Sequence, residues 1–250
     1  MKVLFWIKLF LFFSLLCGSK VYSGNQTTEK KLWFDVIRSN NIQVTEKIIK
    51  SGFNVNIRDD KGRTALSLAC ISGFNKIAKL LLKYYANVNV KDINNQNPLI
   101  AAASYKGNLD TIQILVDAGS DINCKDKYGF SAFLWCLHWG KYKEAKFLLE
   151  KGSDISVINN LGQTALILLS IRSDLEIMKF LVNKGININI KDNSDMTCIE
   201  YAVLSNNLIA VKFLAGFKFD RYVIRKCYKI ALRKKSLLII KFLKSRYRFL

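Results

Sequence analysis

The stretch Asp59-Asp60-Lys61-Gly62-Arg63-Thr64-Ala65-Leu66 decides the fold, because it recurs along the chain. Two close copies are Asp126-Lys127-Tyr128-Gly129-Phe130-Ser131-Ala132-Phe133 and Asn159-Asn160-Leu161-Gly162-Gln163-Thr164-Ala165-Leu166. Weaker copies begin at Asp92 and Asp192, so the five starts are separated by 33, 34, 33 and 33 residues. A period of this length is typical of a solenoid built from stacked repeats.

Within each repeat, turn residues give way to apolar residues at helical spacing. After Gly62 and Thr64, a short run of small and apolar residues continues to Gly73. A second run, with Ile77 and Leu81, follows. This pattern predicts two short helices and a hairpin-like loop per repeat. Helices of about ten residues are not stable alone in water, so stacking of the repeats must stabilise them.

The repeat resembles the ankyrin repeat, whose pattern is D-x-x-G-x-T-P-L-H-x-A-A-x-x-G, a leucine pair and then G-A-D-V-N. The matching residues run from Asp59 to Gly73, with Leu81 and Asn87-Val88-Asn89 after them. The resemblance implies an all-α solenoid of helix-turn-helix units with hairpin loops. The family's His is replaced by Ser67, Ile100, Leu134, Ile167 and Glu200. Since that His ties neighbouring loops together in the family, we expect a weaker hydrogen-bond network along the hairpins.

The repeat starts define the expected organisation of the chain. Residues 24–58 keep only the second half of the pattern and form a linker and a degenerate N-terminal capping repeat. Ankyrin repeats are expected at 59–91, 92–125, 126–158, 159–191 and 192–220. Residues 221–250 lack the turn and are expected to form two basic C-terminal capping helices.

Residues 1–23 have the features of a secretory signal peptide. They begin with Met1-Lys2, are strongly apolar, and end in Val21-Tyr22-Ser23 before Gly24. The uninterrupted apolar core, Leu9 to Cys17, is far shorter than the roughly 20 residues of a membrane-spanning helix. We therefore expect an exported protein, periplasmic or secreted. An uncleaved anchor and lipidation at Cys17 remain alternatives.

The composition argues against an enzyme. The chain has 250 residues, half of them hydrophobic, which excludes a disordered tail. A single histidine, His138, removes most metal sites and catalytic triads. Cys136 is two residues from His138 on the expected helix and would not face it. We expect no cofactor, no metal site and no small-molecule substrate. Cys124, on a loop between repeats, is the best candidate for a reactive thiol.

The resemblance places partner contacts at the hairpin tips and the exposed side of the first helix. The third complete repeat is richest in aromatic residues there. Aromatic and Arg side chains are the usual anchors of protein interfaces. The expected partner-binding residues are Tyr105, Tyr128, Phe130, His138, Trp139, Arg172 and Met196. Trp135, by contrast, is expected to lie in the core. An alternative for Trp139 is a purely structural role in its repeat.

The positive charge is concentrated at the C-terminus. The whole chain has 39 Lys and Arg against 19 Asp and Glu, but residues 221–250 hold eleven of these basic residues and no acid. Such a segment is either a solvated outer face or a contact with an anionic membrane or wall polymer; we do not expect nucleic acid. The candidate contact residues are Arg225, Lys226, Lys229, Arg233, Lys234 and Lys235.

Two functional hypotheses follow from these observations. The first is an exported, non-enzymatic ankyrin-repeat protein that binds a protein partner through its concave face and hairpin tips. The second is a structural protein of a membrane or cell envelope, held there by its basic C-terminal cap. The identity of the partner is not encoded in any motif of the sequence.

Overall fold

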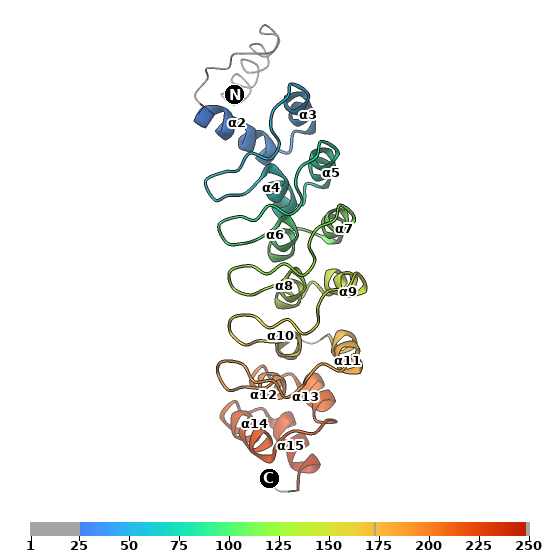
Figure 1. Ribbon diagram of the computed structural model, residues 1–250. Helices are drawn as coiled ribbons and strands as arrows, with labels where there is room; N and C mark the ends of the chain where they lie inside the picture. Colours follow the sequence, from blue (N-terminus) through green and yellow to red (C-terminus); the bar gives the residue numbers. More distant parts are fainter. Residues whose placement is uncertain (1–25, 173, 249–250) are drawn as a thin grey trace. The chain divides into compact units, whose positions relative to one another are not determined.

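The computed structural model describes residues 26–172 and 174–248 (Figure 1). This part of the chain holds fourteen α-helices, and its only isolated β-bridge joins Arg58 and Thr64. The predicted leader, its cleavage pattern before Gly24 and the alternative lipid site at Cys17 lie outside the described residues. The chain divides into two compact units, Met1–Asp126 and Lys127–Leu250, and each is described by itself.

The first unit contains three pairs of helices in succession (Figure 1). They are α2 (Gln26–Arg38) with α3 (Ile42–Lys50), α4 (Ala65–Ser72) with α5 (Asn75–Lys83), and α6 (Pro98–Ser104) with α7 (Leu109–Asp117). α4 packs between α2 and α6, and α5 packs between α3 and α7. The first helices of the pairs thus form one layer and the second helices another.

The second unit repeats this arrangement with four pairs (Figure 1). They are α8 (Ala132–Trp139) with α9 (Tyr142–Glu150), α10 (Ala165–Arg172) with α11 (Leu175–Asn183), α12 (Cys198–Leu204) with α13 (Leu208–Leu214), and α14 (Arg221–Arg233) with α15 (Leu237–Arg246). α8, α10, α12 and α14 pack in sequence, α11 packs on α13, and α13 packs on α15. The predicted all-α repeat solenoid is confirmed, and each predicted repeat and cap contains one helix pair.

The two helix layers are buried to different extents. All six residues from Ala65 to Cys70 in α4 are buried, whereas α5 buries Ile77, Ala78 and Leu81. Small side chains allow the first helices to pack closely between their neighbours. In the second helices, apolar residues three or four positions apart form a single apolar face. Each fully buried Leu or Ile contributes about 1.5–3 kcal/mol, which offsets the poor stability of helices this short.

Side-chain caps set where the first helices begin. The Thr64 hydroxyl accepts a hydrogen bond from the Ser67 backbone N–H at 3.3 Å, and Asn97 accepts one from Ile100 at 2.9 Å. Such caps satisfy backbone donors that the helix itself leaves unpaired. The carboxylate of Asp59 accepts backbone hydrogen bonds from Lys61 and Arg63, both at 2.9 Å. Asp92 and Asp192 act in the same way, each accepting from two backbone N–H groups of its own turn.

Hydrogen bonds that do not need the family's His join successive hairpins. In the second unit the Asn160 N–H donates to the Tyr128 carbonyl at 2.9 Å, and the Asn193 N–H donates to Leu161 at 3.0 Å. The side-chain amides of both asparagines donate to neighbouring carbonyls as well, at 2.9 Å. The asparagine-rich turns therefore supply links between repeats where the family's His is missing.

The extra residue of the 34-residue repeat lies between its two helices. α4 ends at Ser72, and only Gly73, which has a φ of 71°, and Phe74 separate it from α5. After α6, four residues from Tyr105 to Asn108 precede α7. The insertion thus lengthens the turn and leaves the packed helices in register.

Candidate functional site

Four aromatic side chains lie together at α8: Phe130, Trp135, His138 and Trp139. We call them the α8 aromatic cluster. The rings of Phe130 and Trp135 are stacked with centroids 4.4 Å apart, and those of Trp135 and Trp139 are nearly parallel at 6.4 Å. The His138 ring meets the other three edge-on, at 5.0–5.8 Å. The cluster is therefore one continuous packed surface.

The local sequence explains why these rings meet. Residues 135, 138 and 139 are spaced three and four apart and share one side of α8. The opposite side carries Phe133 and Leu137, which are fully buried. Phe130 comes from the hairpin just before the helix, whose start is fixed by the Ser131 hydroxyl accepting from Leu134 N–H at 3.3 Å. Gly140, with a φ of 71°, ends the helix directly after Trp139.

The structure corrects two predictions about this cluster. Phe130 was predicted to contact a partner at the hairpin tip, but it is only 7% exposed because Trp135 stacks on it. Trp135 was predicted to lie in the core, but it is only half-buried and sits between Phe130 and Trp139. The side chain that the cluster presents most openly is Trp139, which is 49% exposed.

The surroundings of His138 favour its neutral form. Burial among the rings lowers the pKa of His138 from its ordinary value, and the nearby positive charge of Arg172 lowers it further. Arg172 is exposed at the end of α10, the helix that packs on α8. The cluster thus combines an uncharged aromatic surface with a neighbouring cation, an arrangement suited to recognition.

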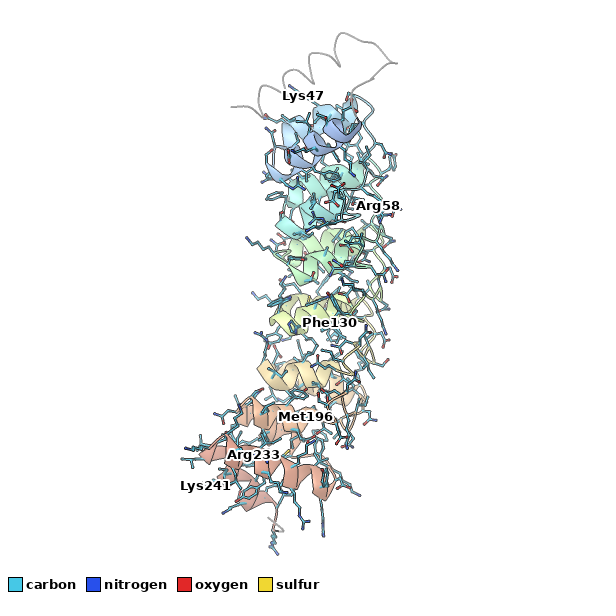
Figure 2. All side chains as sticks on the ribbon, turned by 90° about the vertical axis from the view of Figure 1, so that its left-hand side faces the viewer. Lys47, Arg58, Phe130, Met196, Arg233 and Lys241 are labelled. Atoms are coloured by element: carbon cyan, nitrogen blue, oxygen red, sulfur yellow. The ribbon has the colours of Figure 1, made fainter. Side chains whose placement is uncertain are left out.

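The other predicted partner residues lie on turns. Tyr128 is 53% exposed on the hairpin before α8, with the Lys127 ammonium 5.0 Å from its ring centre. Met196 is half-buried on the hairpin before α12, where its N–H donates to Asp192 at 3.1 Å. Tyr105 belongs to the first unit and is 55% exposed at the end of α6. Figure 2 shows Phe130 and Met196 among the side chains of the second unit.

The C-terminal helices expose most of the predicted basic residues. Arg225, Lys229, Arg233, Lys234 and Lys235 are exposed on α14 and the turn after it. Lys226 differs: its ammonium lies 2.9 Å from the buried Glu200 carboxylate and donates to the Asp195 carbonyl at 2.8 Å. We therefore correct the assignment of Lys226, because it pairs within the protein and not with an external anion.

The cysteines are built into the core. Cys70, Cys124, Cys136, Cys198 and Cys227 are all buried and unpaired. Cys124 is only 4% exposed and burial raises its pKa above the usual value, so the structure favours the inert interpretation over a reactive thiol. Cys136 is completely buried, like Ala69 and Ala102 at the same position of their repeats.

In the part of the chain that the structure describes, no three His, Cys, Asp or Glu side chains are grouped so that they could hold a metal ion. None of the helices from α2 to α15 is long and apolar enough to cross a membrane.

Helix pairs stacked in two layers and joined by hairpins define a helical-repeat protein. The family model for ankyrin repeats, in three copies, matches residues 32–126, 86–159 and 133–222. The chain therefore belongs to the ankyrin-repeat family. Ankyrin repeats generally mediate protein–protein interaction and are typically not enzymes, since stacked repeats present extended binding surfaces.

Several known proteins share part of this sequence. The chain is 32% identical over 121 residues to the inactive serine/threonine-protein kinase TEX14 of Bos taurus, covering 48% of this chain and 8% of that protein. It is 31% identical over 104 residues to the putative ankyrin repeat protein FPV024 of Fowlpox virus, covering 41% and 17%. It is 37% identical over 86 residues to protein phosphatase 1 regulatory subunit 12A of Mus musculus, covering 34% and 8%. The chain thus spans only a small part of each of these relatives.

Proposed function

We propose that this chain binds a protein partner through the α8 aromatic cluster, with Trp139 as the central anchor. The observation that carries the proposal is that Trp139 is 49% exposed while stacked on half-buried Trp135. Tryptophan is strongly enriched among the residues that dominate binding energy. A ring already held by its neighbours loses little conformational freedom when a partner covers it.

The surroundings of the cluster suggest the chemistry of the partner. An apolar or aromatic side chain would cover Trp139, because the cluster offers ring surface and an uncharged imidazole. Exposed Arg172 nearby favours a carboxylate on the partner next to that apolar group. We extend the proposed contact surface to Tyr128 and Met196, while Phe130 packs against the buried side of the cluster.

Site-specific photo-crosslinking tests this proposal. A photoreactive phenylalanine analogue at Tyr128, beside the cluster, should crosslink one protein from the native source, and the same analogue at Phe180 should not. Phe180 is a matched control because it is 41% exposed on α11, away from the hairpins of the same unit. Excess unlabelled protein should compete for the crosslink. Loss of Trp139 should weaken this competition by about tenfold or more, as for an interface hot spot.

Two outcomes distinguish binding from folding. Trp139→Ala should leave the helical circular dichroism spectrum unchanged, since the side chain is half exposed. If Trp139→Ala competes as well as the unaltered protein, the α8 aromatic cluster is not the interface. An equal crosslink from position 180 would also contradict the proposal.

Export of the chain is a separate proposal. It is supported by the sequence of residues 1–23, which has a charged start, an apolar core and a cleavage pattern before Gly24. The intact mass of the protein from its native compartment tests it. A chain that begins at Gly24 supports export by cleavage, a lipid on Cys17 indicates lipoprotein processing, and an unprocessed Met1 contradicts both.

A further inference from the structure

The last two second helices carry exposed aliphatic side chains at a position that is charged in the four second helices before them. The second residue of α5, α7, α9 and α11 is Lys76, Asp110, Lys143 and Glu176, respectively. The second residue of α13 is Ile209, which is 59% exposed, and that of α15 is Leu238, which is 68% exposed. An exposed aliphatic residue therefore replaces a charge in two successive repeats.

This exposure belongs to the position itself and is not caused by a missing neighbour. α13 packs against α11 on one side and α15 on the other. Ile209 is nevertheless 59% exposed, because the buried face of α13 consists of Ala210, Val211 and Leu214. Leu238 precedes Ile239 and Leu243, the equivalent buried residues of α15. Single exposed aliphatic residues are common, but two at one repeat position form a surface feature.

The segment that carries these two residues is almost entirely positive. Residues 201–250 contain thirteen Lys and Arg but one carboxylate, Asp220. That carboxylate is used locally, because it accepts from the Tyr222 N–H at 2.6 Å at the start of α14. Lys212 and Lys241 are exposed at the fifth position of α13 and α15. Arg233, Lys234 and Lys235 are exposed on the turn that leads into α15.

We infer that the start of α13 and α15, together with the turn 233–235, docks on an anionic phospholipid bilayer. Ile209 and Leu238 enter the boundary between headgroups and acyl chains. Lys212, Lys241 and the basic turn remain at the phosphate level. Aliphatic side chains surrounded by Lys and Arg are the pattern of helices that lie at a membrane surface.

A lipid surface fits these residues better than an acidic macromolecule does. A nucleic acid or acidic polymer would use the cations but would gain nothing from exposed Ile209 and Leu238. A bilayer uses both, since its surface is negative and its interior is apolar. Figure 2 shows Arg233 and Lys241 at the left-hand edge of the C-terminal helices, where their side chains are open to such a surface. This inference is independent of the α8 aromatic cluster.

Vesicle co-sedimentation of the full chain tests the inference with matched variants. The probes are vesicles of phosphatidylcholine alone and vesicles with about 30% phosphatidylserine, which mimic neutral and anionic leaflets. Ile209→Ser with Leu238→Ser removes the aliphatic pair, and Lys212→Gln with Lys241→Gln removes two cations. The controls are Ile93→Ser with Leu161→Ser, which are 67% and 59% exposed, and Lys76→Gln with Lys79→Gln at the same positions of α5.

We expect the unaltered chain to bind the anionic vesicles more strongly than the neutral ones. Each test pair should weaken binding by about tenfold, and each control pair by much less. The aliphatic test pair contacts the acyl boundary and the lysine test pair contacts the phosphates, whereas the control residues lie outside the proposed contact. All variants keep the same residues 1–23, so differences among them do not arise from that segment. Equal binding to both vesicle types, or equal binding by test and control variants, would overturn the inference.

A fluorescent label at position 238 gives an independent readout. The five described cysteines are buried, so in a chain that also carries Cys17→Ser a thiol introduced by Leu238→Cys can be labelled selectively with an environment-sensitive dye. Its emission should shift to the blue with anionic vesicles and remain unshifted with polyglutamate or DNA. The contrary result has two parts: anionic vesicles do not shift the dye emission to the blue, and polyglutamate or DNA competes with the vesicles for the protein. In that case the basic surface recognises an acidic macromolecule and the inference is wrong.

Discussion

The ammonium of Lys226 in α14 lies 2.9 Å from a carboxylate oxygen of Glu200 in α12, whose side chain is only 1% exposed. Glu200 occupies the position of the family's His. Its second oxygen accepts from the backbone N–H and hydroxyl of Thr197, at 2.7 and 2.8 Å. One buried carboxylate thus caps its own helix and holds the C-terminal helix pair.

Removing either partner of this ion pair should destabilise the second unit, but the loss of Lys226 should cost more than the loss of the Glu200 charge. Lys226→Met leaves the buried Glu200 charge uncompensated and should cost about 3 kcal/mol in the free energy of unfolding. Glu200→Gln should cost about 1 kcal/mol, because the Lys226 side chain is 29% exposed and can turn to water. Urea unfolding measures both values. A larger loss for Glu200→Gln would contradict this account.

The same pair predicts a stability change at high pH. The hydrogen bond to Glu200, followed by the charges of Glu200 and Asp195, raises the pKa of Lys226 above its ordinary 10.5. Since the folded protein holds the proton more tightly, this stabilisation is complete below pH 10.5 and is lost as pH rises through the raised value. The stability difference between the unaltered protein and Lys226→Met should therefore be constant from pH 7 to about 10 and shrink above that. Chemical unfolding at several pH values measures it; a constant difference would argue against the pair.

His138 provides a direct test of the α8 aromatic cluster, because it is the only histidine in the chain. Burial, and then Arg172, lowers the pKa of His138 below its ordinary 6.5. Its contribution to stability is complete above pH 6.5 and is lost as pH falls through the lowered pKa. An NMR titration should show one imidazole with this lowered pKa, and Trp139→Ala should raise it by exposing the ring. A pKa at or above 6.5 in the unaltered protein would refute the packed cluster.

Two glycines that both have a positive φ should lose different amounts of stability when they are replaced by alanine. Gly152 and Gly162 have φ values of 91° and 77°, so alanine strains the backbone at both. A Cβ at Gly152 meets nothing within 4 Å, whereas at Gly162 it would lie 2.7 Å from the Asn193 side-chain oxygen and 2.8 Å from its backbone nitrogen. We expect Gly152→Ala to cost about 1 kcal/mol and Gly162→Ala about 3 kcal/mol in unfolding experiments. Equal costs would show that the hairpins are not packed this closely.

The described cysteines should resist modification in the folded protein. Burial raises the pKa of all five thiols, for Cys198 to about 12. Because the thiolate is the reactive form, neither exposure nor ionisation favours reaction at pH 8. Mass spectrometry after maleimide treatment should show these five thiols unmodified without denaturant and modified in urea. Rapid native modification of Cys124 would restore its original assignment as a reactive site.

The repeated turns made most of the fold predictable. Asp59 and Thr64 act within a few residues of themselves, so their hydrogen bonds could be inferred from local sequence. The sequence also indicated that Lys234 and Lys235 are exposed, because basic residues with no acidic residue near them in the sequence have no local ion-pair partner. Ile209 and Leu238 stand at a position that is charged in the four preceding second helices, a signal that becomes clear only when the second helices are aligned.

Packing between elements was not predictable in the same way. Phe130 and Trp135 exchanged their expected roles because stacking between a hairpin residue and a helix residue decides which ring is covered. Lys226 could not be separated from its basic neighbours, since its partner Glu200 lies 26 positions earlier in the sequence.

The sequence by itself determined the class of fold and the order of its repeats, because turn chemistry and helical periodicity act over a few residues. It also determined where charge and aromatic residues are concentrated. Only the tertiary structure decided which of those side chains are presented to a partner. Exposure depends on what neighbouring repeats bring against each residue, and that left Trp139 open, covered Phe130, and paired Lys226 with Glu200.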